Sequence, residues 1–241
     1  ETDLNTLLSK KNSSTFDSVY TEIKLLVDML QPYKTPLIGF AGAPFTVASY
    51  MIEGGSSKDL RTTKKMMLQN PTLFHTLLNN LSDITIEYLN GQIQSGVHAI
   101  QLFDSWTNSL SWDDFKNVSQ KYLSHIITKL HNPHQVPITI FCKGMGQFYP
   151  IIQSCGCNVM GFDWNTELNE IKNKIPPNIA IQGNLDPHLL YAPPQLLKQR
   201  VQHIIHTMAD RPGFIFNLGH GILPDVDPDQ VKRVVDWVKD N

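Results

Sequence analysis

The chain has 241 residues, of which 41% are hydrophobic and 17% are charged, and its formal net charge is -2 at pH 7. This composition argues against a disordered or membrane-embedded chain, and it provides no basic surface for a nucleic-acid partner. No linker or low-complexity segment interrupts the sequence, so we expect a single domain over residues 1–241.

The cysteines and the N-terminal residues bear on the location of the protein. Cys142, Cys155 and Cys157 are too few and too unevenly placed for a disulfide framework, and we interpret them as free thiols in a reducing compartment. The opening residues, ETDLNTLLSKKNSST, contain no apolar signal-peptide core, and no apolar run is as long as a membrane span. These features predict a cytoplasmic protein without a membrane partner.

The pattern of apolar residues predicts alternating strands and helices. A helix over residues 16–31 leads into the first of six short apolar runs, which we interpret as strands at 36–42, 98–105, 136–143, 158–164, 179–186 and 213–221. Such near-continuous runs are typical of strands buried on both faces of a parallel sheet. Further helices are expected at 71–95, 113–130, 166–174, 194–209 and 227–240, the last started by Asp227 and Pro228.

The β-α alternation predicts an α/β fold, either an open doubly wound sheet or a closed (β/α)8 barrel. No G-x-G-x-x-G turn follows the first strand. Several strands instead end in polar residues, as in barrels whose sites are spread over the carboxyl ends of many strands. These residues are Ser105, Lys143, Asp163, Asp186 and His220. We therefore favour the (β/α)8 barrel, with about six of its eight β-α units in this chain and two absent from the N-terminal side.

The first two strands are followed by candidate binding residues. A glycine-containing loop at 39–57 carries Tyr50, whose phenol can exchange hydrogen bonds with a ligand, although a tight turn before a core tyrosine is the alternative. Ser105 ends the run QLFDSW, where its hydroxyl can face the barrel mouth, or where it or Asp104 caps a helix. No G-x-S-x-G elbow surrounds Ser105, so a serine hydrolase is poorly supported.

The later strands add further candidates. His220 lies between Gly219 and Gly221 after the last strand, which favours a ligand contact over a packed core histidine. Asp163 in GFDW is another candidate, whereas Asp186 precedes a proline and is better explained as a turn or helix-start residue.

Two short motifs carry weaker signals. The segment KGMG at 143–146 could contact an anion through its backbone and Lys143. Cys155-Gly156-Cys157 is a C-x-C pattern with no matching histidine pair, so we expect no metal site there.

Five segments, GFAGAPFTVASYMIEGGSSK, QLFDSW, GFDW, QGNLDP and FNLGHGILPDVDP, together resemble uroporphyrinogen decarboxylase of the bacterial type, from about residue 3 to the C-terminus. The resemblance implies a (β/α)8 barrel that removes the carboxyl groups of the four acetate side chains of uroporphyrinogen III. The product is coproporphyrinogen III, an intermediate of porphyrin and heme biosynthesis. The resemblance implies no cofactor and no metal, and a homodimer. Tyr50, Ser105 and His220 match substrate-contacting positions of the family, and Phe103 is expected to line the same pocket.

Two elements of the family pattern are not in this sequence. The family has an aspartate near the end of an early strand, which stabilises a cationic intermediate, and an R-Q-A-G-R-Y segment near the N-terminus, which binds substrate carboxylates. The arginines of this sequence are Arg61, Arg200, Arg211 and Arg233, in or near predicted helices or at the entry to the last strand. We therefore interpret the chain as the C-terminal two-thirds of the enzyme, with an unassigned catalytic residue and little or no activity alone.

Two alternatives stay open. A related barrel methyltransferase of the cobalamin-dependent type holds zinc through a His-x-Cys element, but Phe141-Cys142-Lys143 stands at the candidate position here, which disfavours zinc. A non-catalytic remnant that pairs with another polypeptide through an open sheet edge is the other.

Overall fold

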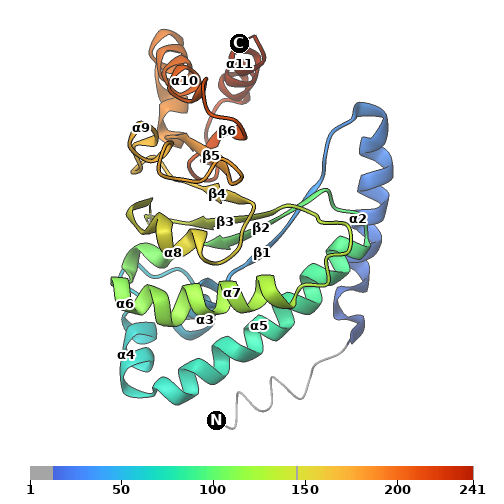
Figure 1. Ribbon diagram of the computed structural model, residues 1–241, viewed down its shortest axis with the longest axis vertical. Coiled ribbons are helices and arrows are strands. Elements are labelled where there is room, and N and C mark those ends of the chain that lie inside the picture. The colour runs from blue at the N-terminus through green and yellow to red at the C-terminus, as the bar shows by residue number, and fades with distance from the viewer. Residues whose placement is uncertain (1–12, 145, 241) are drawn as a thin grey trace.

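The computed structural model describes residues 13–144 and 146–240 (Figure 1). Its centre is one parallel sheet whose six strands neighbour each other in chain order. The strands are β1 (Ile38–Gly42), β2 (Ala99–Asp104), β3 (Ile138–Cys142), β4 (Val159–Gly161), β5 (Ala180–Leu185) and β6 (Phe214–Leu218). Each lies within its predicted range, so the six strands and the α/β class are confirmed.

Helices follow the strands in the order expected for parallel crossovers. The longer ones are α2 (Asp17–Leu30), α3 (Pro44–Glu53), α4 (Arg61–Gln69), α5 (Pro71–Gln94), α7 (Lys121–Lys129), α10 (Pro194–Met208) and α11 (Pro228–Lys239). Shorter turns are η1 (Ser13–Phe16), η2 (Gln31–Tyr33), η3 (Thr107–Ser109), α6 (Trp112–Phe115), η4 (Lys116–Gln120), η5 (Gly146–Phe148), α8 (Tyr149–Gln153), α9 (Leu168–Ile171) and η6 (Pro187–Tyr191). None of the described helices combines the length and apolar character that a membrane crossing requires.

Most predicted helices are confirmed, with two adjustments. The helix expected at 113–130 is divided by η4, a π-helical turn, and the helix expected at 166–174 is reduced to the four residues of α9. The last helix begins as predicted, because the Asp227 carboxylate accepts the backbone N–H of Asp229 at 2.9 Å and Pro228 occupies the first turn.

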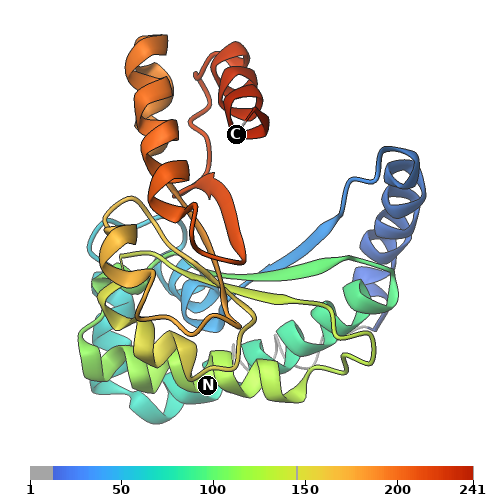
Figure 2. The ribbon, with the colours of Figure 1, turned by 45° about the horizontal axis from the view of Figure 1, so that its top comes forward.

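The hydrophobic core lies between the sheet and its helix layer. Figures 1 and 2 show α5 and α7 running along one face of the first strands, while α10 and α11 pack together beside the last ones. Fully buried side chains from β2, β3, α5 and α7 meet there, among them Leu102, Ile140, Phe74 and Leu123. This helix layer does not cover the opposite face of the sheet, and the candidate site described below lies on that face.

Burial on both faces is confirmed for β3 but wrong for β1 and β6. All five residues of β3 are buried, whereas Ile38 and Phe40 of β1 are 50% and 60% exposed and Ile215 of β6 is 43% exposed. β1 and β6 are the edge strands of the described sheet. Their exposed side chains therefore lack one flanking strand among the described residues.

The segment expected as a loop at 39–57 contains the helix α3. Pro44 occupies its first turn, and Gly54 ends it with a left-handed φ of 75°. Proline at the start and glycine just past the end are the usual boundary signals of a helix. Tyr50 is therefore held by a helix rather than by a loop.

Candidate active site

A cavity of about 520 Å³ opens on the sheet face opposite the helix layer and extends to the carboxyl ends of the strands. Phe103, Ser105 and His220 line it, which brings together three of the four residues predicted to contact substrate. Phe103 and Ser105 alternate with the fully buried Leu102 and Asp104, as successive side chains of an extended chain must. The volume lies in the range of small-molecule sites.

A row of aromatic rings forms one wall of this cavity. The ring of Phe103 lies edge-on to those of Phe40 and Phe141, with centroids 5.9 and 6.0 Å apart. The ring of Phe141 in turn lies 6.2 Å from that of His220. Phe141 was not predicted as a site residue, because a phenylalanine inside an apolar run carries no signal that separates it from the core.

His220 stands at the end of this row in an environment that disfavours its charged form. Burial lowers the pKa of His220, the positive charge of Lys143 lowers it further, and Asp163 acts in the opposite direction. The neighbouring Gly219 is required for close packing, because a Cβ at this position would lie 2.7 Å from the backbone nitrogen of Trp164. A Cβ at Gly221 would meet no atom within 4 Å.

Two buried glutamines form a polar part of the cavity lining. The side-chain amide of Gln182 donates to the side-chain oxygen of Gln101 at 3.2 Å. Sequence reasoning missed both. The available signal was a glutamine that follows isoleucine at the same point of two apolar runs, HAIQLFDS and IAIQGNLD.

Asp163 lines neither the cavity that contains His220 nor the second one, and its carboxylate is bound by backbone groups. Its carboxylate accepts the N–H groups of Gly144 and Asn165, and the amide of Asn184 donates to its carbonyl at 3.0 Å. One backbone N–H of the KGMG segment is therefore already bound to a carboxylate, and Met145 lies outside the described residues. Asp163 therefore joins the segment that follows β3 to the end of β5 by hydrogen bonds.

Asp186 has the helix-start role expected for it. Its carboxylate accepts the backbone N–H of His188 at 2.9 Å, which caps η6, and contacts the ring Nδ1 of the same histidine at 2.8 Å. Asp186 does not line the cavity that contains His220; it lines a second one.

Tyr50 is not among the residues that line the cavity with Ser105. Its side chain is 44% exposed, which is incompatible with a core-packing tyrosine. The ring instead lies edge-on to that of Trp106, with centroids 5.7 Å apart. Trp106 directly follows Ser105 in the chain. The ring contact therefore links Tyr50 to the segment that contains Ser105.

Asp104 is fully buried beneath Ser105. Its carboxylate accepts the hydroxyls of Thr46 and Ser119, each at 2.6 Å. Burial raises the pKa of Asp104 to about 6, while the two hydroxyl donors act in the opposite direction. The carboxylate of Asp104 also accepts the backbone N–H of Thr46 in the first turn of α3, so Asp104 caps this helix from the neighbouring strand rather than a helix that follows β2.

The three cysteines are buried thiols. Burial raises the pKa of Cys142 well above its usual value, and that of Cys155 and Cys157 to about 11 and about 12. Across the part of the chain that the structure describes, no three histidine, cysteine, aspartate or glutamate side chains cluster as metal ligands would.

None of the four arginines lines the cavity that contains Ser105 and His220. The Arg211 guanidinium donates to the backbone carbonyls of Ile175, Pro176 and Ile179, before the amino end of β5, as its predicted position implied. Arg61 begins α4, and Arg233 lies on α11.

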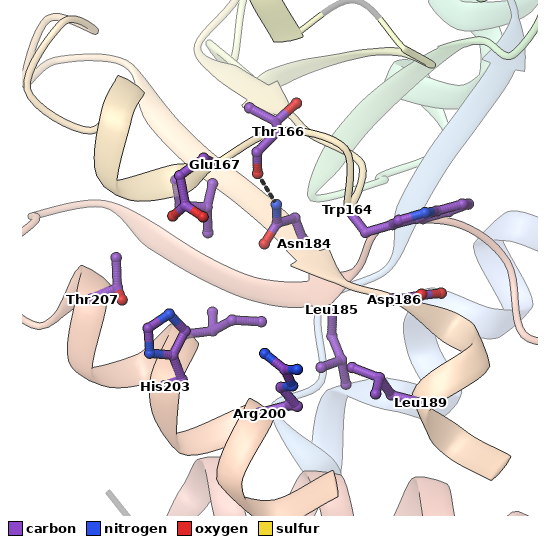
Figure 3. Close-up of a pocket in the computed structure, with 12 residues that line it drawn as sticks. Trp164, Thr166, Glu167, Asn184, Leu185, Asp186, Leu189, Arg200, His203 and Thr207 are labelled. Atoms are coloured by element: carbon purple, nitrogen blue, oxygen red, sulfur yellow. Dashed lines mark hydrogen bonds between the residues drawn. The ribbon is translucent and has the colours of Figure 1, made fainter. Parts of the chain in front are cut away.

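A second cavity of about 310 Å³ lies between α10 and the connection that follows β4 (Figure 3). Arg200 and His203 approach it from α10, and Glu167 and Asn184 lie across from them. It contains none of the predicted substrate contacts. Trp164 lines it and also places its ring 6.5 Å from that of His220, so this indole stands between the two cavities.

Comparison with solved structures supports the barrel architecture. A methyltransferase from Methanosarcina mazei superposes with a TM-score of 0.77 at 19% identity, over 92% of this chain and 63% of that one. A B12-independent methionine synthase from Shewanella sp. W3-18-1 gives a TM-score of 0.63 at 11% identity, over 96% and 68%. At these identities the likeness concerns the fold alone.

Comparison with sequences identifies the family. The family profile described as "Uroporphyrinogen decarboxylase (URO-D)" matches residues 1–241. The uroporphyrinogen decarboxylase of Protochlamydia amoebophila is 46% identical over 219 residues, which are 90% of this chain and 60% of that protein. That of Ruthia magnifica is 41% identical, over 98% of this chain and 70% of its own length. The chain therefore belongs to the uroporphyrinogen decarboxylase family, whose fold is the (β/α)8 barrel predicted from its sequence.

Proposed function

We propose that the protein catalyses the cofactor-independent decarboxylation of the four acetate side chains of uroporphyrinogen III, giving coproporphyrinogen III in heme biosynthesis. The observation that carries this proposal is the cavity at the strand ends, where Phe103, Ser105 and His220 lie together in segments that match the family pattern. We further propose that Tyr50 contacts the same substrate from α3.

The cavity suits a flat ring system that carries polar arms. The edge-on rings of Phe103 and Phe141 offer an apolar surface to a pyrrole. Ser105 and the Gln101–Gln182 pair provide hydrogen-bonding groups within the same cavity. Because its pKa is lowered, His220 is a neutral imidazole at pH 7, which donates one hydrogen bond and accepts another.

The reaction needs no external electron acceptor. Protonation of a pyrrole carbon next to the acetate-bearing carbon makes the ring cationic, and the electrons of the breaking C–C bond flow into that ring as carbon dioxide leaves. A second proton then adds to the exocyclic carbon to form the methyl group, and the proton first added to the ring is lost, so one proton is consumed for each carbon dioxide released. A preorganised carboxylate stabilises such a cation electrostatically. The carboxylates of Asp104 and Asp163 are engaged by internal donors, so we assign neither of them to this role.

The setting of the reaction is part of the proposal. We propose a homodimer of single-domain subunits, as the family resemblance implies. The free thiols favour the cytoplasm as its location. The net charge of -2 argues against a nucleic-acid partner.

The methyltransferase alternative finds little support in the site. Cys142 is buried, and among the described residues it belongs to no group of three histidine, cysteine, aspartate or glutamate side chains that could hold a zinc ion.

The test is anaerobic incubation with uroporphyrinogen III, with chromatography to count the carboxyl groups lost. The 241-residue chain and the protein at the full length that its gene encodes are compared. Stepwise loss of four carboxyl groups with the gene-length protein supports the proposal. A folded gene-length protein that leaves all eight carboxyl groups in place contradicts it.

A further inference from the structure

Asp104 ends β2 as a fully buried carboxylate whose hydrogen-bond partners are neutral. Thr46 on α3 donates to one of its oxygens and Ser119 on η4 donates to the other, each at 2.6 Å. A buried carboxylate is costly unless hydrogen bonds stabilise it, so this one holds its two hydroxyl donors firmly in place. The carboxylate thereby joins the end of β2 to two separate helical elements.

The hydroxyl of Thr46 makes a second bond that depends on the first. Its oxygen accepts the backbone N–H of Trp106 at 3.3 Å. A helical threonine hydroxyl commonly turns back to the carbonyl four residues earlier, as Thr85 does here towards Leu81 at 2.8 Å. Because a hydroxyl has one hydrogen, donation to Asp104 turns that hydrogen away from the helix and leaves a lone pair for Trp106.

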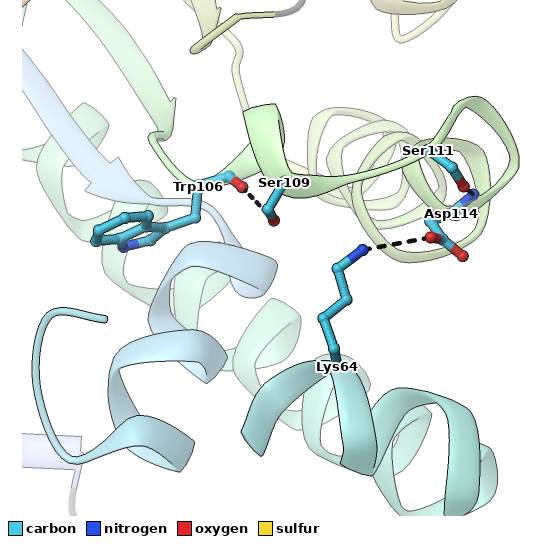
Figure 4. Close-up of polar contacts among 5 residues, drawn as sticks. All are labelled: Lys64, Trp106, Ser109, Ser111 and Asp114. Atoms are coloured by element: carbon cyan, nitrogen blue, oxygen red, sulfur yellow. Dashed lines mark hydrogen bonds and ion pairs between the residues drawn. The ribbon is translucent and has the colours of Figure 1, made fainter. Parts of the chain in front are cut away.

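The bond to Trp106 fixes the segment that contains Ser105. In Figure 4, Trp106 projects from the connection after β2 while its carbonyl accepts the hydroxyl of Ser109, at 2.8 Å. The backbone N–H and the carbonyl of Trp106 are thus both anchored. Tyr50 lies one helical turn after Thr46, on the same side of α3, and its ring contacts the indole of Trp106.

We propose that Asp104 is a positioning residue that sets Ser105 and Tyr50 relative to each other through the hydroxyl of Thr46. Asp104 itself never touches substrate, because it is completely enclosed. The catalytic consequence rests on the proposed function, since it requires that Ser105 and Tyr50 contact uroporphyrinogen III. The structural consequence, the anchoring of the backbone at Trp106, does not.

The test compares Thr46→Val, which removes the hydroxyl and keeps the branched shape, with Thr46→Ser, which keeps the hydroxyl. Thr85→Val is the matched control, because Thr85 is equally buried and its hydroxyl bonds only within α5. The first readout is hydrogen exchange of the Trp106 backbone amide, measured by NMR. We expect about tenfold faster exchange in Thr46→Val, and wild-type exchange in Thr46→Ser and Thr85→Val.

The second readout is the steady-state kinetics of the gene-length protein with uroporphyrinogen III. We expect Thr46→Val to raise KM more than it lowers kcat, with rescue by Thr46→Ser, because substrate contacts are misplaced while the reacting groups stay intact. If the valine variant does not fold, Thr46→Ala replaces it, since alanine removes the hydroxyl without crowding.

The outcomes separate the two proposals. Unchanged exchange at Trp106 without the hydroxyl overturns the positioning role, as does equal loss in Thr46→Ser and Thr46→Val. Faster exchange at Trp106 in a protein whose wild type does not decarboxylate uroporphyrinogen III upholds the anchoring and refutes the proposed function instead. Faster exchange with unchanged kinetics restricts Asp104 to a structural role and overturns the proposal.

Discussion

The ring of His220 meets the ring of Phe141 edge-on, with 6.2 Å between their centroids, and Lys143 follows Phe141 by two residues. One strand end therefore sets both an apolar ring and a cation against the same imidazole. The pKa of His220 is lowered by burial and by the Lys143 charge together. Replacing Lys143 by methionine removes the second cause and keeps the length of the side chain.

We expect Lys143→Met to raise the pKa of His220 towards its usual value, because the nearby positive charge no longer opposes protonation. An NMR titration of the imidazole proton signals measures this directly. Lys129→Met, on α7 in the helix layer, is the control and should leave the midpoint in place. An unchanged titration midpoint of His220 in Lys143→Met would contradict the assignment of part of the lowered pKa to the Lys143 charge.

The role of His220 in substrate binding is tested by His220→Asn in the gene-length protein. We expect kcat/KM to fall at least about tenfold, the loss for one hydrogen bond to substrate, while the melting temperature changes little because His220 is solvent-accessible. His134→Asn, an exposed histidine before β3, is the control. Parallel losses of activity and melting temperature would indicate a structural histidine.

Tyr50→Phe isolates the phenolic hydroxyl from the ring. The ring contact with Trp106 remains, so we expect an unchanged melting temperature and about a tenfold lower kcat/KM, the effect of one lost hydrogen bond. Tyr33→Phe, whose side chain is 77% exposed on η2, should affect neither quantity. Full activity of Tyr50→Phe would remove the hydroxyl from the site.

Asp104 gives stability a specific pH dependence. The folded state raises its pKa from 3.8 to about 6, so between these values the folded protein binds a proton that the unfolded chain has lost. The free energy of unfolding therefore falls as pH rises through this window, by about 3 kcal/mol for this group, and levels off above it. Urea unfolding at several pH values should show this fall relative to Asp104→Asn. Parallel pH profiles of the two proteins would contradict the raised pKa.

Two glycines on either side of His220 form a matched pair. Gly219→Ala places a Cβ against the backbone of Trp164 and Asp163, and we expect a loss of about 1 to 3 kcal/mol in the free energy of unfolding. Gly221→Ala meets open space and should be nearly neutral. Chemical denaturation measures both. Equal effects would show that the packing at Gly219 is not the cause.

The strands and most helices were predictable because each expresses a local periodicity or a boundary residue, as Asp227 and Pro228 do for α11. The helix α3 was not predicted although Pro44 and Gly54 mark its ends, because the glycines that flank it favour a loop as well. The exposure of Ile38 and Phe40 could not be foreseen, since an apolar run does not reveal which strand lies at a sheet edge.

The candidate site was predictable only in part. Ser105 and His220 stand at strand ends, and the alternation along β2 places Phe103 with Ser105, so the topology brings them together. The partners of Asp104 lie 58 residues earlier and 15 residues later in the chain, and no local pattern connects them. Long-range hydrogen bonds of this kind become visible only once the fold has set α3 and η4 against β2.

Trp164 supplies the protein with an internal optical reporter. Its indole lies edge-on to the imidazoles of both His188 and His220, with centroids 6.0 and 6.5 Å apart. A protonated imidazole quenches indole fluorescence more strongly than a neutral one. The emission of Trp164 is thus sensitive to the charge of His220, which lines the cavity at the strand ends, and a His188→Asn variant would remove the other imidazole beside this indole.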